Sequence, residues 1–95
     1  MISIVYLAHY SPSVLSDDLM RAGIRVWDCL SISEVEFLCE QRSVDVVVIA
    51  AGFEPELTAE IKRCQVCIEL KSEPKVADVL WELSLLFPGS TAMVQ

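Results

Sequence analysis

The amino-acid sequence predicts an α/β fold: an open parallel sheet of four strands in the order 2-1-3-4, with helices on both faces, in three layers. Four short apolar runs alternate with four amphipathic stretches along the chain. The run at residues 44–51 is broken only by Asp45, which is typical of a parallel strand that helices cover on both sides. The connections between the runs are too long for hairpins and have the length of crossover connections.

The first part of the chain is predicted to hold two strands with a helix between them. Residues 2–7 form an apolar run with the length of a buried strand. Ser11 can cap a helix and Pro12 suits its first position, and apolar residues then recur at helical spacing until Gly23, a helix-ending residue. Residues 24–30 alternate apolar and other side chains with a charge on each face, which predicts an edge strand.

The middle of the chain continues this pattern. Ser31 precedes a glutamate at capping-box spacing, so a helix is predicted over residues 32–42. The central strand ends at Gly52, which predicts a turn, and a short helix with a thin apolar stripe is expected to end near Cys64. Residues 66–71 alternate like a second edge strand.

The last helix and the domain limits complete the expected architecture. The helix is predicted over residues 75–87, after Pro74 and before residues 88–89, a Pro-Gly pair. Residues 90–95 are expected to be a frayed tail, so one domain should span residues 1–89. The most apolar strand belongs in the interior and the alternating strands at the edges, which favours the order 2-1-3-4.

Composition and charge narrow the class of protein. Hydrophobic residues make up 54% of the chain and charged residues 22%, which predicts a folded globular unit. The formal net charge is -7, and the seven Lys and Arg residues are spread along the chain. We therefore expect no nucleic-acid binding and no association with anionic membranes. The first apolar run is too short for a signal peptide or a membrane span, so a cytoplasmic location is expected, with reduced thiols and no cofactor.

Two of the four cysteines form a CxxC pair, Cys64 and Cys67. This spacing suits disulfide exchange or a shared metal ion. A thioredoxin-like pair opens a helix, whereas this pair is predicted to close a helix and enter a strand. A zinc site would need further ligands, and Cys29, Cys39 and His9 are available only if the fold brings them together. We expect ordinary thiols and no metal site, with thiol redox chemistry as an alternative.

A second group of polar residues is predicted to lie at the carboxyl ends of strands. His9 follows the first strand, where open α/β sheets bind ligands. Ser11 follows at the start of a helix whose free N–H groups can hold an anion. With Gly52 after the third strand, these residues are a candidate pocket for a small anion or nucleotide. The alternative is a capped helix start beside a partly exposed histidine. The sequence assigns no catalytic residue, because no acid or nucleophile is placed to form a triad with His9.

The last helix has more apolar surface than packing on one face of a small sheet requires. Apolar residues surround nearly the whole axis, and its only charges are Asp78 and Glu82, four residues apart. A helix packed on a sheet needs an apolar face of about a third of its circumference. The excess, which includes Trp81, Leu85 and Phe87, predicts burial against a second chain or another protein. The alternative is that a small four-strand domain wraps the helix more fully.

Three segments resemble a receiver domain of the bacterial response-regulator type, which has the CheY-like, flavodoxin-like fold. Residues 21–26 resemble the end of a receiver's first helix, its glycine and its second strand. Residues 43–50 resemble the third strand, which in that family carries an acidic residue, four aliphatic residues and the phosphate-accepting aspartate. Residues 68–71, followed by a proline and an apolar helix, resemble the last strand with its active-site lysine and the last helix. The resemblance covers most of the chain.

The departures from that family bear directly on function. Ala50 stands where the phosphoacceptor carboxylate would be, and residues 6–7 or 8–9 stand where two acidic residues would hold Mg²⁺. Receiver-type phosphoryl transfer needs a carboxylate nucleophile and oxygen ligands for the metal. The chain is also one βα unit short of the usual five. The resemblance therefore implies a shortened, degenerate receiver, or a member of the wider flavodoxin-like group. In it Lys71 has lost its signalling role and is expected to be a solvated edge lysine.

We therefore expect a non-catalytic protein-interaction module, not an enzyme, that is not switched by aspartyl phosphorylation. It should associate through Trp81, Leu85 and Phe87 of its last helix, as a homodimer or with another protein. One alternative is a binder of a small anion or nucleotide at the loops after strands 1 and 3, with His9, Ser11, Gly52 and Lys71 as candidate ligand-binding residues. A second is a thiol redox protein that uses the two cysteines of the CxxC pair.

Overall fold

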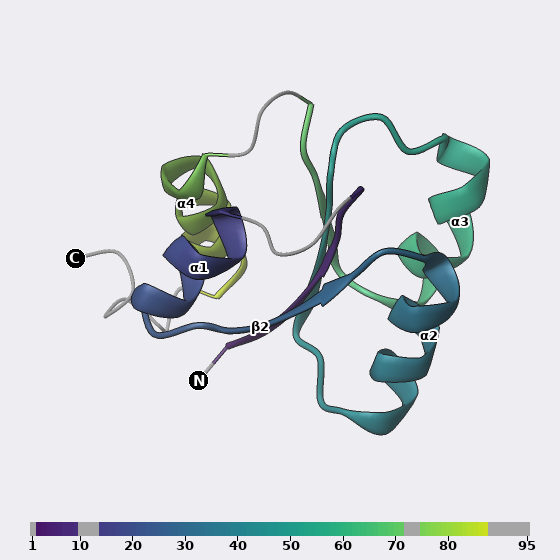
Figure 1. Ribbon diagram of the computed structural model, residues 1–95, viewed down its shortest axis with the longest axis horizontal. Helices are drawn as coiled ribbons and strands as arrows, with labels where there is room; N and C mark the ends of the chain where they lie inside the picture. The colour runs from purple at the N-terminus through teal and green to yellow at the C-terminus, as the bar shows by residue number, and fades with distance from the viewer. Residues whose placement is uncertain (1, 10–13, 72–74, 88–95) are drawn as a thin grey trace.

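The computed structural model describes residues 2–9, 14–71 and 75–87, and its strands and helices alternate along the chain (Figure 1). The elements are β1 (Ser3–Leu7), α1 (Val14–Arg21), β2 (Arg25–Cys29), α2 (Ile32–Gln41), β3 (Val46–Ile49), α3 (Pro55–Cys64), β4 (Cys67–Glu69) and α4 (Val76–Leu86). The four strands are parallel and lie in the order β2-β1-β3-β4. The predicted fold class and strand order are confirmed.

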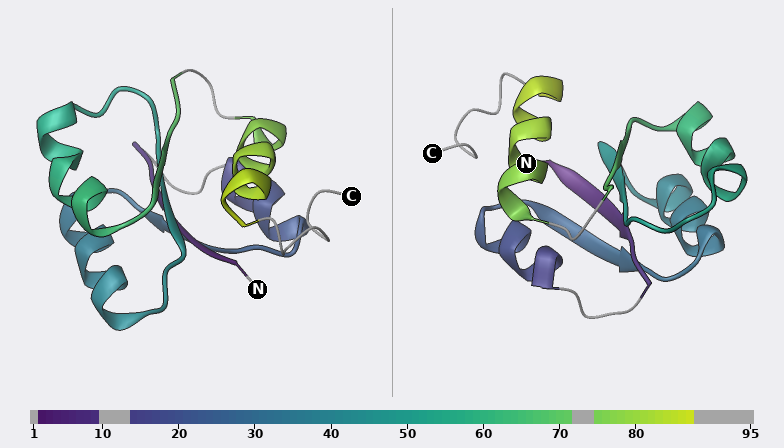
Figure 2. Two further views of the ribbon diagram at one scale, coloured as in Figure 1. Left: turned by 180° about the vertical axis from the view of Figure 1, so that it is seen from behind. Right: turned by 90° about the horizontal axis from the view of Figure 1, so that it is seen from above.

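The sheet is the middle of three layers: α1 and α4 cover one face, and α2 and α3 cover the other (Figures 1 and 2). Side chains of a strand point alternately to the two faces, so each central strand contributes to two apolar cores. The first core lies under α1 and α4: Ile2, Ile4, Tyr6, Ala8, Leu15, Leu19, Ile24, Val46, Val48, Ile68, Val79 and Leu83. The second core lies under α2 and α3: Val5, Leu7, Cys29, Val35, Val47, Ile49 and Ile61. This two-sided burial explains why β3 has no polar face.

Local signals set the ends of several elements as the sequence predicts. Gly23 follows α1 with a φ of 89°, a left-handed conformation that favours glycine, and its N–H donates to the Met20 carbonyl. The Ser31 side chain caps α2 by accepting a hydrogen bond from the Glu34 N–H at 3.3 Å. Gly52 has a φ of 97° in the turn after β3.

Other predicted boundaries shift or lie outside the described residues. β3 begins at Val46 rather than at residue 44, and the Asp45 carboxylate just before it accepts a hydrogen bond from the Ser3 N–H at 2.8 Å. β4 is shortened to Cys67–Glu69. The predicted cap at Ser11, the first helical position at Pro12, Pro74 before the last helix and the tail at residues 90–95 lie outside the described residues.

The last helix, α4, packs beside α1 rather than beside α3 (Figure 2). Val79 and Leu83 are completely buried in the first core, and Val76, Leu80 and Phe87 pack against it more loosely. These five residues recur at helical spacing and form the single apolar stripe that a surface helix needs. Among the described residues, no helix has the length and apolar character to cross a membrane.

Candidate functional site

The loops after β1 and β3 meet at the carboxyl edge of the sheet. His9 Nε2 donates a hydrogen bond to the Ala51 carbonyl at 2.7 Å, since a carbonyl oxygen can only accept. The His9 ring stacks on Phe53 with centroids 4.2 Å apart and planes 9° apart. A Cβ on Gly52 would lie 3.3 Å from His9 Nε2, so the absence of a side chain there permits this close approach. The structure thus brings His9 and Gly52 together, whereas Ser11 lies outside the described residues.

A small hollow of about 150 Å³ lies beside this contact, at the carboxyl ends of β3 and β4. Its lining includes Ala50, Gly52 and Lys71, so the lysine that the sequence singles out lies near the predicted loop. Lys62 also lines the hollow and pairs with Glu69. The hollow therefore offers two cationic side chains, one of them paired with Glu69, which also lines the hollow.

The sequence did not single out Phe53, which completes the contact at this edge. The sequence signal for Phe53 was its place as an aromatic residue directly after the turn glycine Gly52. Its contact with His9 joins residues 44 positions apart, which sequence periodicity does not report. The stacked rings lie at the carboxyl ends of β1 and β3, from which the chain continues to helices on opposite faces of the sheet, and this is the usual ligand position in open α/β sheets.

The four cysteines are free thiols. Burial, with Glu34 nearby, raises the pKa of Cys29 to about 11, and burial, with Glu69 nearby, raises the pKa of Cys67 to about 11. Burial also raises the pKa of Cys39. These environments favour the thiol over the reactive thiolate. Cys64 is the exposed member of the CxxC pair, and it closes α3 as predicted.

The part of the chain that the structure describes contains no preformed metal site. Within residues 2–9, 14–71 and 75–87, no three His, Cys, Asp or Glu side chains are grouped so that they can hold an ion. Cys39 and Cys64 do line one cavity, between α2 and α3.

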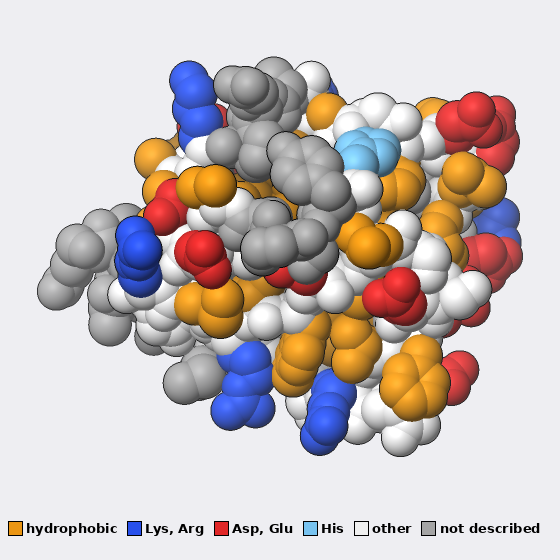
Figure 3. Space-filling view, viewed as in Figure 1, with side chains coloured by type: hydrophobic (Ala, Val, Ile, Leu, Met, Phe, Trp, Pro, Cys, Tyr) orange, Lys and Arg blue, Asp and Glu red, His pale blue; other side chains and the backbone are white. Residues whose placement is uncertain are grey.

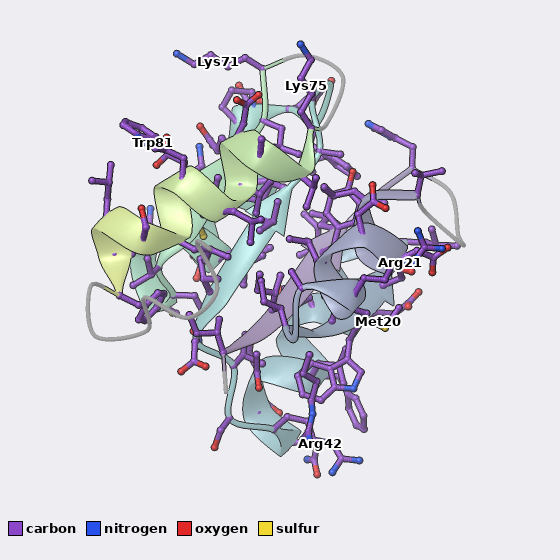
Figure 4. All side chains as sticks on the ribbon, turned by 90° about the vertical axis from the view of Figure 1, so that its left-hand side faces the viewer. Met20, Arg21, Arg42, Lys71, Lys75 and Trp81 are labelled. Carbon is purple, nitrogen blue, oxygen red and sulfur yellow. The ribbon has the colours of Figure 1, made fainter. Side chains whose placement is uncertain are left out.

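The outer face of α4 carries two large apolar side chains in contact with solvent. Trp81 is 60% exposed and Leu85, one turn later, is 61% exposed. Figure 4 shows Trp81 on the side of α4 that points away from α1. The exposed carboxylates Asp78 and Glu82 flank this pair. Phe87, the third residue expected on this face, instead packs against the first core and is partly buried.

A polar contact beneath α1 was also missed by the sequence. Ser16 is 1% exposed and its hydroxyl donates a hydrogen bond to the Asp28 carboxylate of β2. The sequence indicated only a charge on an edge strand. The contact joins α1 to the sheet, and its burial assigns it a structural role, because buried polar groups are costly unless they are hydrogen-bonded.

Comparison of this chain with known proteins finds no matching family model, no matching curated protein and no matching solved structure.

Proposed function

We propose that this protein is a non-catalytic interaction module that associates with a second copy of itself through the outer face of α4. One observation carries the proposal: Trp81 and Leu85 remain exposed on a helix that already buries a full stripe in the first core. An exposed aromatic residue beside an aliphatic one is typical of the anchors of protein interfaces. The fold does not need these two side chains for its own packing.

A two-fold arrangement of antiparallel α4 helices uses this face well. In an isologous pair, residue i of one copy contacts residue j of the other and the reverse, so only a residue on the two-fold axis meets its own counterpart. With the axis at Trp81, the two indole rings meet, and Leu85 faces the exposed Ala77 of the second copy. The same register places Asp78 opposite Ser84 and Glu82 opposite Leu80. A small residue opposite a large one is the usual complement at helix contacts.

We infer further that the module is a shortened, degenerate receiver of the cytoplasm. The strand order and the position of Lys71 at the carboxyl edge support this relation, whereas Ala50 is the departure that would make the receiver degenerate. Phosphorylation would need a carboxylate at the position of Ala50. The four free thiols are in keeping with a reducing compartment. Regulation by aspartyl phosphate is therefore not part of the proposed function.

Light scattering tests the self-association directly. From low micromolar concentration upward, the wild type should approach twice its monomer mass of 10.6 kDa. Leu85→Asp should remain a folded monomer, because a carboxylate in the contact is desolvated without a partner. Met20→Asp is the matched control, since Met20 is an exposed apolar residue on α1 (Figure 4). A wild type that stays monomeric, or a control that dissociates as readily as Leu85→Asp, contradicts the proposal.

A second candidate function is the binding of a small anion at the carboxyl edge. The observation that favours it is the hollow lined by Lys62 and Lys71, at the edge where parallel sheets bind ligands. Inorganic phosphate or ADP should then raise the melting temperature by mass action, and Lys71→Ala should remove the effect. Lys75→Ala is the control, because Lys75 lines a different hollow, between β4 and α4. The absence of any shift at millimolar ligand contradicts this candidate.

A further inference from the structure

The helical layer opposite α4 contains a cavity between its two helices. The cavity, about 260 Å³, lies between α2 and α3. Its lining includes the buried side chains Val35 and Ile61, with Glu36, Glu40 and Glu60 also contributing. An apolar floor with an acidic border is thus built from two helices that are separate in sequence.

The acidic border has few cations of its own. The two helices carry five glutamates: Glu34, Glu36, Glu40, Glu56 and Glu60. Their only basic residues are Lys62, which pairs with Glu69 of β4, and Arg63, which pairs with Glu60 at 3.0 Å. Glu36 and Glu40 form no ion pair with any residue in the described ranges. Two carboxylates beside the cavity are therefore available to an external cation.

Exposed apolar side chains extend this surface beyond the cavity. Leu57 is 55% exposed and precedes Ile61 by four residues, which places both on the same side of α3. Phe37 is 61% exposed on α2, where it lines a separate hollow with Ser33, Glu34 and Leu38. Figure 3 shows acidic and apolar side chains interleaved on the side of the molecule that carries α2 and α3. A merely solvated acidic face does not require exposed leucine and phenylalanine.

We propose that the groove between α2 and α3 binds a basic amphipathic helix of another protein. One large apolar side chain of that helix enters the cavity, and its Lys or Arg residues pair with Glu36 and Glu40. The volume suits this occupant, because cavities for whole small-molecule ligands usually exceed about 300 Å³. A second copy docked symmetrically in this groove is a poor occupant, because its own Glu36 and Glu40 would lie next to those of the first copy. This surface is separate from the α4 face, so the two proposals stand independently.

The test uses a synthetic peptide of about five helical turns, made of leucine on one face and lysine on the others. Binding of the dye-labelled peptide is measured by fluorescence anisotropy at moderate ionic strength. Two control peptides replace lysine by glutamate or leucine by alanine. The Leu/Lys peptide should bind about tenfold or more tightly than either control, because the groove needs both the charge and the apolar face. Equal binding of the Leu/Lys and Ala/Lys peptides overturns the proposal.

Substitutions locate the binding site. Glu36→Lys should lower the affinity for the Leu/Lys peptide about tenfold, because it places a positive charge at the cavity that repels the lysines of the peptide. Asp17→Lys makes the same change of charge at an exposed position on α1, and it should change affinity less than about twofold. Equal losses for the two variants would indicate only a general attraction to an acidic protein and refute the groove. Leu85→Asp should bind the peptide as the wild type does; loss of binding there would place the peptide on α4 instead.

Alkylation of Cys64 supplies a readout at the groove itself. This cysteine is exposed and lines the cavity. A saturating amount of Leu/Lys peptide should slow its reaction with iodoacetamide about fivefold or more, as followed by mass spectrometry of the intact protein, because the bound helix covers the thiol. An unchanged rate in the presence of bound peptide overturns the proposal. Circular dichroism confirms that each variant retains its helices.

Discussion

Two leucines one half-turn apart on α4 provide the sharpest check of how this helix is packed. Leu83 is completely buried in the first core, whereas Leu85 is 61% exposed. Replacing a buried leucine by alanine removes about three methyl-sized groups, and burying each of these contributes about 0.8 kcal/mol to stability. The substitution also leaves a cavity, which adds to the loss. We therefore expect Leu83→Ala to lower the free energy of unfolding by about 3 to 5 kcal/mol. Leu85→Ala should cost less than about 1 kcal/mol, because most of its side chain is already in water and alanine favours the helix slightly.

Urea unfolding followed by circular dichroism at 222 nm measures both values, at a protein concentration where light scattering gives the monomer mass. In thermal melts Leu83→Ala should lower the melting temperature by at least about 12 °C, given about 4 to 8 °C per kcal/mol for a domain of this size. Equal losses for the two variants would refute the packing described for α4. At higher concentration the wild type should gain more stability through self-association than Leu85→Ala does, and a Leu85→Ala protein that gains as much would count against the proposed contact.

Three further outcomes are expected. At neutral pH, iodoacetamide should label Cys64 well before Cys67. The pKa of Cys67 is raised from the ordinary cysteine value of 9.0 to about 11, which lowers its thiolate fraction about a hundredfold. Faster labelling of Cys67, seen by peptide mapping, would contradict this. The raised pKa of Cys29 means that the folded state holds its proton while the unfolded thiol ionises. The contribution of this proton to the free energy of unfolding should therefore be fully present below about pH 9, and up to about 2 to 3 kcal/mol of it should be lost as the pH rises to 11. Cys29→Ala should reduce this loss in urea titrations. Equal alkaline losses in the two proteins would rule out this thiol as the cause. Gly52→Ala should cost about 1 to 3 kcal/mol, because of the positive φ and the nearby His9 ring; His9→Ala should relieve part of that loss, and the absence of any relief would show that backbone conformation alone sets it.

The outer face of α4 and the groove between α2 and α3 differ in their side-chain chemistry. The α4 face carries the exposed Trp81 and Leu85, which we propose as the contact with a second copy. The α2–α3 face combines a cavity with unpaired carboxylates beside it, which a copy of the same acidic chain does not satisfy. A module with one self-complementary face and one face for a basic partner would link dimerisation to recruitment. The experiments above separate these functions, since each uses variants on one face and controls on another.

Much of the candidate site was within reach of sequence reasoning, because its signals are local or periodic. The turn at Gly52 and the cap at Ser31 follow from backbone and side-chain chemistry over a few residues. Lys71 was singled out through the resemblance to the receiver family, and it lies just after β4, which ends at Glu69. The stacking of His9 on Phe53 did not follow, since it joins two loops that only the pairing of β1 with β3 brings together. The cavity between α2 and α3 was missed for the same reason.

The last helix shows most clearly which decisions belong to tertiary structure. Its apolar residues cover almost the whole circumference, so periodicity alone does not say which side packs inward. Phe87 was expected outside with Trp81, and it packs against the first core because it shares the stripe of Val79 and Leu83. The side of the sheet that α4 covers was likewise undetermined by sequence.

The sequence by itself determined the succession of strands and helices, the parallel sheet and the order of its strands. These features depend on the local period of apolar residues and on the length of connections, and both are written in the chain. Tertiary structure alone decided that α4 lies beside α1, which leucines of α4 meet water, and that His9 lies against Phe53. The physical reason is that burial depends on which surfaces meet in space, and a contact between distant segments exists only after the sheet has aligned them.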